Sequence, residues 1–359
     1  MNMIQHNLVN SFKGKKVFIT GHTGFKGSWL AFLMNEIGAE VCGYSLPPSQ
    51  PQNHFEMLKL KEKIKHIEGD IRDGVGLSDA LNHFQPEYVF HLAAQALVRP
   101  SYQDPATTFS TNVMGSVNLL NAVRTCNSVR SLVYVTSDKC YENVEWVWGY
   151  RETDQLGGRD PYSASKAAAE IVFSSFVRSF FGDRPALGAA SARAGNVIGG
   201  GDWAVDRIIP DCIRAIKADQ PVCLRNPGAT RPWQHVLEPI RGYMMLAVRL
   251  YEKPKIWEGA WNFGPSTVEI RTVKTVAELI VSHIGKGRVE LVESPSQVHE
   301  ARLLQLNCDK AHQLLGWHPL WNVDKTLEAT ALWYKAILSG ESAEEVTRQQ
   351  LYEFFPELV

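Results

Sequence analysis

The segment that most constrains the fold is residues 16–30, where a short apolar run meets three regularly spaced glycines. Residues 16–20 are rich in β-branched and aromatic side chains, which is typical of a buried strand. Gly21, Gly24 and Gly27 follow, and an apolar pattern with helical spacing begins at Trp29. This order predicts a strand, a tight turn and a helix whose N-terminal N–H groups hold an anion such as a dinucleotide pyrophosphate.

The three glycines have different expected roles in this turn. Gly21 allows the turn, Gly24 lets backbone N–H groups approach the anion, and Gly27 lets the helix pack against the strand. Glycine-rich turns are common, so a strand-to-helix turn without a ligand is the alternative. The turn residues that we expect to contact a dinucleotide are Gly21, Thr23, Gly24, Phe25, Lys26 and Gly27. His22 and Lys26 are expected close to the pyrophosphate.

Further strands alternate with helical patterns along the first half of the chain, which predicts an α/β fold with a doubly wound parallel sheet. After residue 195 this alternation loosens, so we expect a mainly dinucleotide-binding domain over 1–195 and a smaller mixed α/β lobe over 196–359, with segments crossing between them. The expected strands are 40–45, 65–70, 88–95, 131–137 and 186–193, and the expected helices are 105–125, the segment from 160 to about 180, and those beginning at 273 and 309.

Composition excludes several classes of protein. The 359 residues include 37 basic and 38 acidic side chains, a balance that does not suggest nucleic acid or an anionic membrane as a partner. Six cysteines show no metal-ligand spacing, so we expect reduced, mostly buried thiols and no metal. Residues 1–14 lack the apolar core of a secretion signal, and no run is long enough to span a bilayer. We therefore expect a cytoplasmic protein.

Candidate dinucleotide contacts follow the ends of several expected strands. An Asp or Glu usually follows the second strand and binds the adenosine ribose, but Tyr44, Ser45 and a proline-rich loop occupy this position, which leaves the choice between NAD and NADP open. Lys26 either supplies a compensating charge or is solvated. Asp70 either accepts a hydrogen bond from adenine or caps the next helix. The other expected contacts are Ile71 and the small or apolar residues Leu92, Ala93 and Ala94, which leave room for a flat cofactor.

A tyrosine and a lysine four residues apart form the candidate catalytic pair. On a helix, Tyr162 and Lys166 lie on one face about a turn apart. A lysine cation favours the phenolate and is expected to lower the pKa of the tyrosine toward neutrality, giving a base for a sugar hydroxyl. Ser137, at the end of an expected strand, is placed to hydrogen-bond the same substrate oxygen. An amphipathic surface helix is the alternative.

The glycine turn, Ser137, and Tyr162 with Lys166 resemble the extended short-chain dehydrogenase/reductase family, which acts on nucleotide-sugars. Longer motifs are similar to the members that dehydrate CDP-glucose, and the similarity covers nearly the whole chain. These motifs are Thr-Ser-Asp-Lys-Cys-Tyr at 136–141, Trp-Val-Trp-Gly-Tyr-Arg-Glu at 146–152, Gly-Asn-Val-Ile-Gly-Gly-Gly-Asp-Trp at 195–203 and Arg-Pro-Trp-Gln-His-Val at 231–236. The resemblance implies NAD as cofactor and CDP-glucose as substrate.

The resemblance also implies a reaction in three steps and a role for two further residues. NAD+ takes a hydride from C4 of the glucose, water leaves across C5 and C6, and the hydride returns to C6. Asp138 matches the acid that protonates the departing C6 hydroxyl. Its neighbour is Lys139, where related dTDP-sugar dehydratases have a Glu. Lys139 serves as the C5 base only if its pKa is lowered, and otherwise stabilises the enolate as a cation. A surface ion pair of Asp138 and Lys139 is the alternative.

Residues expected to bind the nucleotide-sugar come from both halves of the chain. Arg231 is expected to grip the diphosphate, since a guanidinium binds phosphate oxygens in a bidentate way. Each of three residues has a structural alternative. Arg231 could instead form a salt bridge between the lobes, Asn196 could form a turn, and Trp203 could belong to the core. The full set is Gln95, Asn196, Asp202, Trp203, Arg207 and Arg231. Trp146 and Trp148 either cover the sugar or pin a loop, and His91 and His235 are expected to be structural.

Two rival functions remain from the sequence. A nucleotide-sugar 4-epimerase shares the oxidation step but has no use for Asp138 and Lys139, and a silent dinucleotide-binding scaffold has no use for the tyrosine and lysine. The resemblance further implies a homodimer or homotetramer, in which the helices bearing Asn112 and Tyr162 pair across a two-fold axis.

Overall fold

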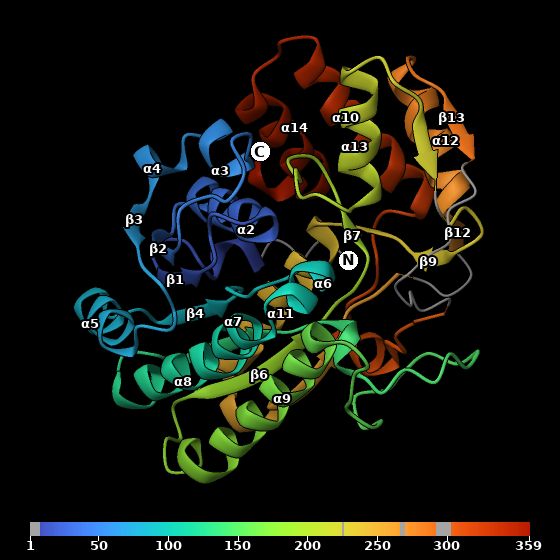
Figure 1. The fold of residues 1–359 in the computed structure, drawn as a ribbon. Helices are drawn as coiled ribbons and strands as arrows, with labels where there is room; N and C mark the ends of the chain where they lie inside the picture. The colour runs from blue at the N-terminus through green and yellow to red at the C-terminus, as the bar shows by residue number, and fades with distance from the viewer. Residues whose placement is uncertain (1–7, 225, 266–269, 292–302) are drawn as a thin grey trace.

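A seven-stranded sheet runs through the protein, and all of its neighbouring strands are parallel (Figure 1). The computed structural model describes residues 8–224, 226–265, 270–291 and 303–359, so the first seven residues of the N-terminal segment discussed above lie outside it. The strand order β11-β6-β5-β4-β1-β2-β3 reverses direction at β1, as in a doubly wound fold, which confirms the predicted fold class. The strands are β1 (Lys16–Thr20), β2 (Glu40–Ser45), β3 (Lys65–Glu68), β4 (Tyr88–His91), β5 (Ser131–Val135), β6 (Gly188–Arg193) and β11 (Gly259–Asn262).

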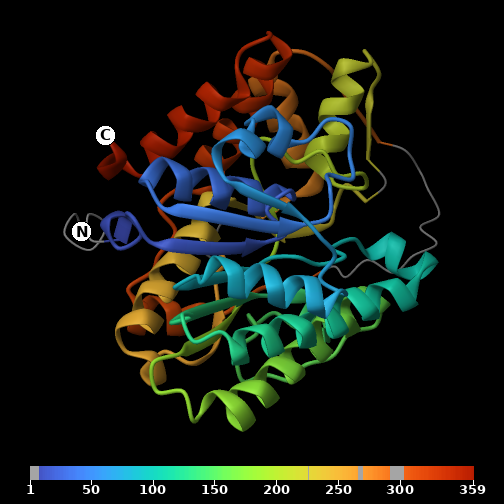
Figure 2. The ribbon, with the colours of Figure 1, turned by 90° about the vertical axis from the view of Figure 1, so that its left-hand side faces the viewer.

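Helices cover both faces of this sheet. One face packs against α5 (Gly74–Phe84), α8 (Gly115–Thr125) and α9 (Pro161–Phe176), and the other against α2 (Phe25–Ile37) and α11 (Leu237–Glu252). In Figure 2 the cyan and green helices lie on one side of the sheet and the red C-terminal helices on the other. Because both faces are covered, the central strands are buried along their whole length, as their apolar sequences predict.

The C-terminal lobe is smaller and packs on the α2 side of the sheet. Its helices are α10 (Ile208–Lys217), α12 (Val273–Ile284), α13 (Val323–Leu338) and α14 (Ala343–Phe354). Its strand pairs are β7 (Val197–Ile198) with β10 (Gln234–His235), β8 (Val222–Leu224) with β13 (Val289–Leu291), and β9 (Thr230–Pro232) with β12 (Ile270–Thr272). Trp29, Trp203 and Trp333 belong to one apolar core that joins this lobe to the sheet. Since α11 and β11 return to the main sheet, a boundary at residue 195 stays a prediction.

Several expected elements have different limits in the structure. The helix expected over 105–125 contains a π-helical segment, Ser110–Met114, between α7 (Pro105–Phe109) and α8. The third strand ends at Glu68 rather than Asp70, because the chain bends at Gly69 beneath the ring of Tyr44. The helix expected from residue 309 begins there, since Asp309 and Lys310 are helical, and it continues as the π-helical turn Ala311–Leu315. It stops after Leu315 because Gly316 adopts a left-handed conformation, with φ of 70°, and Pro319 follows.

All six cysteines are free, and five are buried, as expected for reduced structural thiols. Within the described ranges, none of the helices combines the length and the apolar character that crossing a bilayer requires.

Candidate active site

The carboxyl ends of the central strands and the adjoining edge of the C-terminal lobe line a cavity of about 700 Å³. This is where an open α/β sheet binds its ligands. Most of the residues that the sequence placed in a site line this one cavity: Gly21, Thr23, Gly24, Phe25, Lys26, Gly27, Asp70, Ile71, Leu92, Ala93, Ala94, Gln95, Ser137, Asp138, Lys139, Tyr162, Lys166, Asn196, Asp202, Trp203, Arg207 and Arg231. The N-terminal glycine turn and the mid-chain tyrosine therefore face the same space.

The glycine turn is shaped for close backbone contacts. Gly21 has a φ of 76°, and a Cβ there would lie 2.6 Å from the backbone nitrogen of Ala93. A Cβ on Gly27 would lie 2.1 Å from the carbonyl oxygen of Gly21, so the helix approaches the strand as predicted. Gly24 is the N-cap of α2 and provides no side-chain cap for the first N–H groups of the helix. The turn therefore fits an anionic ligand at the helix N-terminus.

The far side of the turn is joined to the loop after β2. Thr23 Oγ1 lies 2.8 Å from the Ser45 hydroxyl and 2.9 Å from the Leu46 carbonyl oxygen. The Asp70 carboxylate accepts hydrogen bonds from the backbone N–H of Arg72 and from its guanidinium, which lowers the pKa of Asp70. Asp73, rather than Asp70, caps α5, so the capping alternative for Asp70 is wrong.

The structure corrects the expectation for His22. Its ring lies beneath β2, where a Cβ on Gly43 would clash with it, and its Nε2 lies 2.7 Å from His66 Nδ1. Burial lowers the pKa of His22 to about 3, so that the ring is neutral. His22 is therefore a buried support of the turn and lies outside the lining of the cavity, because a side chain that points under the strand cannot also face the ligand.

Lys26 is half-buried at the cavity and contacts another side chain, which argues against the solvated alternative. Its Nζ lies 3.4 Å from the Tyr243 hydroxyl. Burial, together with the positive charges of Lys166 and Arg207, lowers the pKa of Lys26 to about 8, while Asp138 acts in the opposite direction. These neighbours place Lys26 toward the catalytic end of the cavity rather than beside an adenosine ribose.

The catalytic candidates meet where β5 ends and α9 begins. The Ser137 hydroxyl donates a hydrogen bond of 3.0 Å to Asp138 Oδ1, and both side chains are buried. Tyr162 occupies the first turn of α9, where Asp160 caps the helix and the backbone N–H of Tyr162 donates to Ser101. Lys139, half-buried beside them, also lines the cavity. Serine, carboxyl, phenol and two amines therefore share one wall, which is a set suited to proton transfer at a sugar.

The expectation that the pKa of Tyr162 is lowered toward neutrality is wrong for this structure. Burial raises the pKa of Tyr162 to about 12, and the Ser137 hydroxyl and Arg207 only partly oppose it. Burial also lowers the pKa of Lys166 to about 8, although Glu170 acts to raise it. Desolvation penalises the charged form of both groups and is the largest cause of each shift. The spacing of the two residues predicted the face that they share but not how deeply that face is buried.

Most of the residues expected to bind the nucleotide-sugar follow β6 in the chain and line the same cavity. Arg207 forms an ion pair of 2.8 Å with buried Asp202, which raises the pKa of Arg207. Trp203 belongs to the apolar core and also lines the cavity. Its ring packs edge-on against the ring of Tyr334, with 5.3 Å between the ring centroids. Asn196 has a φ of 51°, the left-handed conformation of its turn alternative, and also lines the cavity. Arg231 lies on β9 and donates to the carbonyl of Thr230.

Gln95 lines the cavity, but its side chain holds a loop. The amide nitrogen donates to the Leu97 carbonyl and to Thr108 Oγ1, each at 3.0 Å, and the amide oxygen accepts from the Leu97 N–H. The side-chain amide is thus engaged within the protein. Backbone groups of Gln95 are held by Asn112, whose amide also donates to Ser165 on α9.

Sequence reasoning missed several cavity residues. Arg72, next to Asp70, and His54 both line the cavity. His54 Nδ1 lies 2.9 Å from the Ser28 hydroxyl on α2, and His54 Nε2 lies 3.1 Å from the Thr347 hydroxyl on α14. His54 therefore connects the helix after the glycine turn to the C-terminal lobe. Adjacent charges at 70 and 72 were a usable signal for Arg72. No local pattern marks His54, because its partners lie far away in the sequence.

The remaining candidates lie outside the lining of the cavity. Trp148 is 68% exposed and packs edge-on against Trp146, which stacks on Tyr150, so these tryptophans belong to a surface loop. His91 is buried 2.7 Å from Thr20 Oγ1, and His235 packs between aromatic rings, as expected of structural histidines. Among the described residues, no three His, Cys, Asp or Glu side chains are grouped to hold a metal ion.

Known proteins resemble this chain over most of its length. The model of the family described as GDP-mannose 4,6 dehydratase matches residues 18–330. A CDP-glucose 4,6-dehydratase from Salmonella typhimurium is 46% identical over 349 residues, which cover 96% of this chain and 97% of that protein. A CDP-paratose 2-epimerase from Salmonella typhi is 29% identical and covers 85% of this chain and 94% of that protein.

Solved structures share the same architecture. A Thermus thermophilus UDP-glucose 4-epimerase in complex with NAD superimposes with a TM-score of 0.76 at 26% identity and covers 89% of this chain and 99% of its own. A Streptomyces venezuelae dTDP-glucose 4,6-dehydratase with NAD bound gives a TM-score of 0.76 at 22% identity. The match covers 92% of this chain and 99% of that chain. The chain therefore belongs to the GDP-mannose 4,6 dehydratase family, within the extended short-chain dehydrogenase/reductases that its motifs resemble.

Proposed function

We propose that the protein is an NAD-dependent hydro-lyase that converts CDP-D-glucose to CDP-4-dehydro-6-deoxy-D-glucose and water. The observation that carries this proposal is the single cavity in which Ser137, Tyr162 and Lys166 face the glycine turn, with Asp138 and Lys139 beside them. The Salmonella relative that is 46% identical to this chain supports CDP-glucose as the substrate. Both NAD-bound neighbours support the choice of cofactor.

The turn at Gly21 to Gly27 would hold the cofactor pyrophosphate, and Ala93 and Ala94 leave space for its rings. When bound, NAD supplies a hydride acceptor for C4 and later returns the hydride to C6. Ser137 orients the C4 hydroxyl, and Tyr162, after releasing its own proton to solvent, takes the proton of this hydroxyl as a phenolate. Lys166 stabilises the phenolate form of Tyr162, which burial otherwise disfavours.

Asp138 and Lys139 act in the loss of water. Asp138 is held by the Ser137 hydroxyl at 3.0 Å and donates a proton to the departing C6 hydroxyl. Lys139 acts at C5, either as the base or as the cation beside the enolate. A 4-epimerase would share the oxidation step but would not use this pair.

The diphosphate of the substrate would be held by Arg207 and Arg231, which both line the cavity. Exposed apolar side chains on the α8 and α9 side of the sheet, among them Met114, Ile171 and Phe180, support a homodimer or homotetramer that pairs these helices. We further propose a cytoplasmic location and neither nucleic acid nor membrane as a partner.

A substrate panel tests the proposal. Incubation of CDP-glucose with the protein and NAD+ is expected to give a 4-keto-6-deoxy product, seen by mass spectrometry, without net formation of NADH. Turnover of dTDP-, GDP- or UDP-sugars with none of CDP-glucose would contradict the nucleotide assignment. Formation of a C4 epimer alone would favour the epimerase.

Lys139→Ala tests the elimination step. Its kcat is expected to fall about 100-fold, because a group acting in proton transfer is lost, while the variant still reduces bound NAD+ once per site. The absorbance of reduced nicotinamide after mixing with CDP-glucose measures this first step. Lys61→Ala, on the exposed part of α4 (Leu60–Lys63), is the control. Normal turnover of Lys139→Ala would remove Lys139 from the mechanism.

A further inference from the structure

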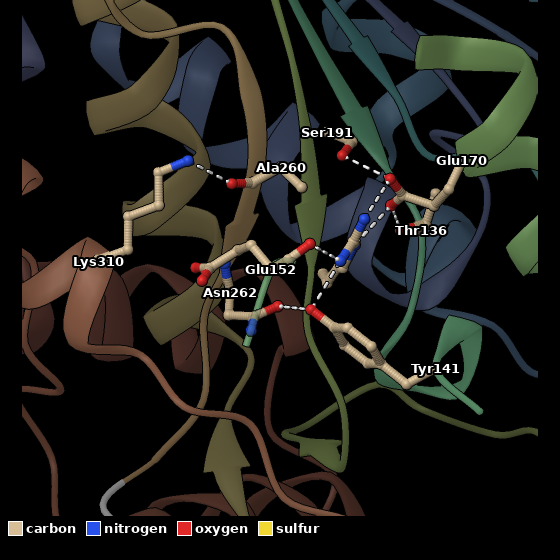
Figure 3. Close-up of polar contacts among 9 residues, drawn as sticks. Thr136, Tyr141, Glu152, Glu170, Ser191, Ala260, Asn262 and Lys310 are labelled. Carbon is tan, nitrogen blue, oxygen red and sulfur yellow. Dashed lines mark hydrogen bonds and ion pairs between the residues drawn. The ribbon is translucent and has the colours of Figure 1, made fainter. Parts of the chain in front are cut away.

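A buried charged network connects α9, the helix that carries Tyr162 and Lys166, to the neighbouring strands, and Figure 3 shows its polar contacts. Its centre is Glu170 on α9, four residues after Lys166 and eight after Tyr162, so that the three side chains follow one face of the helix. Glu170 and its partner Arg193 on β6 are almost completely buried, with side-chain exposures of 3% and 4%. Neither residue lines the cavity.

The Glu170 carboxylate receives hydrogen bonds from two neighbouring strands. Arg193 donates to it through Nε at 3.0 Å and Nη2 at 2.8 Å, and the Ser191 hydroxyl donates at 2.8 Å. Thr136, the residue before Ser137, donates its hydroxyl to the other side of the same carboxylate. Figure 3 shows the Thr136 and Ser191 side chains pointing toward Glu170. The end of β5 is therefore attached to α9 at the level of the catalytic residues.

On the side of Arg193 that faces away from Glu170, the network continues through further hydrogen bonds. Arg193 Nη1 donates to the Tyr141 hydroxyl at 2.7 Å and to the Glu152 carbonyl at 3.1 Å. Tyr141 in turn donates to the Asn262 side chain on β11. A buried ion pair contributes little net stability compared with apolar side chains of the same size, because both charges lose their hydration. The cost of this pair points to a role other than stability alone.

We propose that Glu170 is a positioning residue for the C4 oxidation. Through Thr136 it holds the Ser137-bearing end of β5 against the helix that carries Tyr162 and Lys166, and its carboxylate places a negative charge one helical turn from the Lys166 ammonium. This inference rests on the function proposed above.

The surroundings of Lys166 leave Glu170 as its main anionic neighbour. Cys140, from the turn after β5, also faces Lys166, but burial raises the pKa of this thiol well above its usual range, so it is neutral. His91 on β4 is neutral as well, because burial lowers its pKa to about 3. Lys26 on α2 adds a positive charge and disfavours the ammonium. Tyr162 lies one turn earlier on α9 and is protonated in the resting protein.

The pKa of Lys166, about 8, therefore depends on Glu170 to remain this high. Removal of the Glu170 charge is expected to lower it further, so that Lys166 loses its proton at a lower pH. The phenolate of Tyr162 then loses its stabilising cation. For Glu170→Gln we expect kcat at pH 8 to fall about tenfold with KM within about twofold, and the alkaline limb of the kcat profile to move down by about one pH unit.

Two further variants separate this effect from a structural one. Glu170→Gln leaves Arg193 unpaired, so we also use Glu170→Gln/Arg193→Met, which removes both buried charges and is expected to unfold near the wild-type urea concentration. Its alkaline limb is expected to remain displaced. Glu152→Gln is the matched control, because Glu152 contacts the same network through Asn262 but lies away from Lys166. This control is expected to keep the wild-type pH profile.

A wild-type alkaline limb in the double variant would overturn the inference, as would an equal displacement in Glu152→Gln. Turnover of CDP-glucose by the wild-type protein is measured first. If the wild type is inactive toward CDP-glucose, the proposed function fails. If the wild type is active and the profile of Glu170→Gln is unchanged, only the role of Glu170 fails.

Discussion

The two ends of the cavity are built in different ways. At the glycine turn the lining is mainly backbone, and its shape depends on the absence of Cβ atoms at Gly21 and Gly27. At the catalytic end the lining consists of buried ionisable side chains, whose pKa values are displaced by burial and by one another. Steric fit therefore determines the structure of the first end, and electrostatic interactions determine the protonation of the second. Substitutions at the two ends should therefore fail for different reasons.

Tyr162→Phe is expected to have the largest effect on activity. The variant loses only a hydroxyl, and kcat should fall about 1,000-fold because the base for the sugar hydroxyl is missing. Steady-state kinetics with CDP-glucose measures the loss, and circular dichroism checks the fold. Tyr88→Phe is the matched control, since Tyr88 is also buried but lies at the opposite, amino-terminal end of β4. Retained activity in Tyr162→Phe would mean that the catalytic end does not act through this phenol.

Gly21→Ala tests the steric end. A methyl group there meets the backbone of Ala93 and requires a left-handed conformation, so we expect a loss of about 2–4 kcal/mol in the free energy of unfolding and weaker NAD+ binding. Gly38→Ala isolates the conformational part, because Gly38 has a φ of 85° with open space around it, and should cost only about 1 kcal/mol. Urea unfolding measures both variants. Equal losses would show that crowding at Ala93 does not matter.

Lys166→Met should reveal the cost of the electrostatic end. Burial lowers the pKa of Lys166 from 10.5 to about 8 in the folded protein. Between pH 8 and pH 10.5 the unfolded chain therefore binds more protons than the folded protein, so the free energy of unfolding of the wild type should rise with pH across this range. The cost of burying the charged ammonium is fully present below pH 8. Lys166→Met removes this penalty, so we expect it to be inactive but more stable by about 1–3 kcal/mol at pH 7.

Urea unfolding at pH 7 and pH 10 measures the effect of Lys166→Met. Its pH dependence should be weaker than that of the wild type but not absent, because Lys26 also has a lowered pKa of about 8. Lys61→Met, an exposed lysine, should leave both values unchanged. A destabilised Lys166→Met at pH 7 would show that the ammonium is compensated in the folded protein.

Local patterns predicted much of the fold and the membership of the site. The strands β1 and β2, the turn between β1 and α2, and the start of α9 follow from side-chain period, glycine spacing and the Asp-Pro cap before Tyr162. Errors occurred where a distant partner decides the outcome. His22 turns under β2 because Gly43 leaves space for its ring, and the helix from residue 309 is short because it ends at Gly316.

The sequence by itself determined that a dinucleotide-type turn, a serine at a strand end and a tyrosine-lysine pair occur in one chain, because these signals depend on neighbours a few residues apart. Only the tertiary structure decided that they face one cavity, that His54 joins α2 to α14, and that Glu170 and Arg193 form a buried ion pair. Burial also decided the protonation of Tyr162 and Lys166. The physical reason is that desolvation depends on every segment packed around a group, and those segments come from across the whole chain.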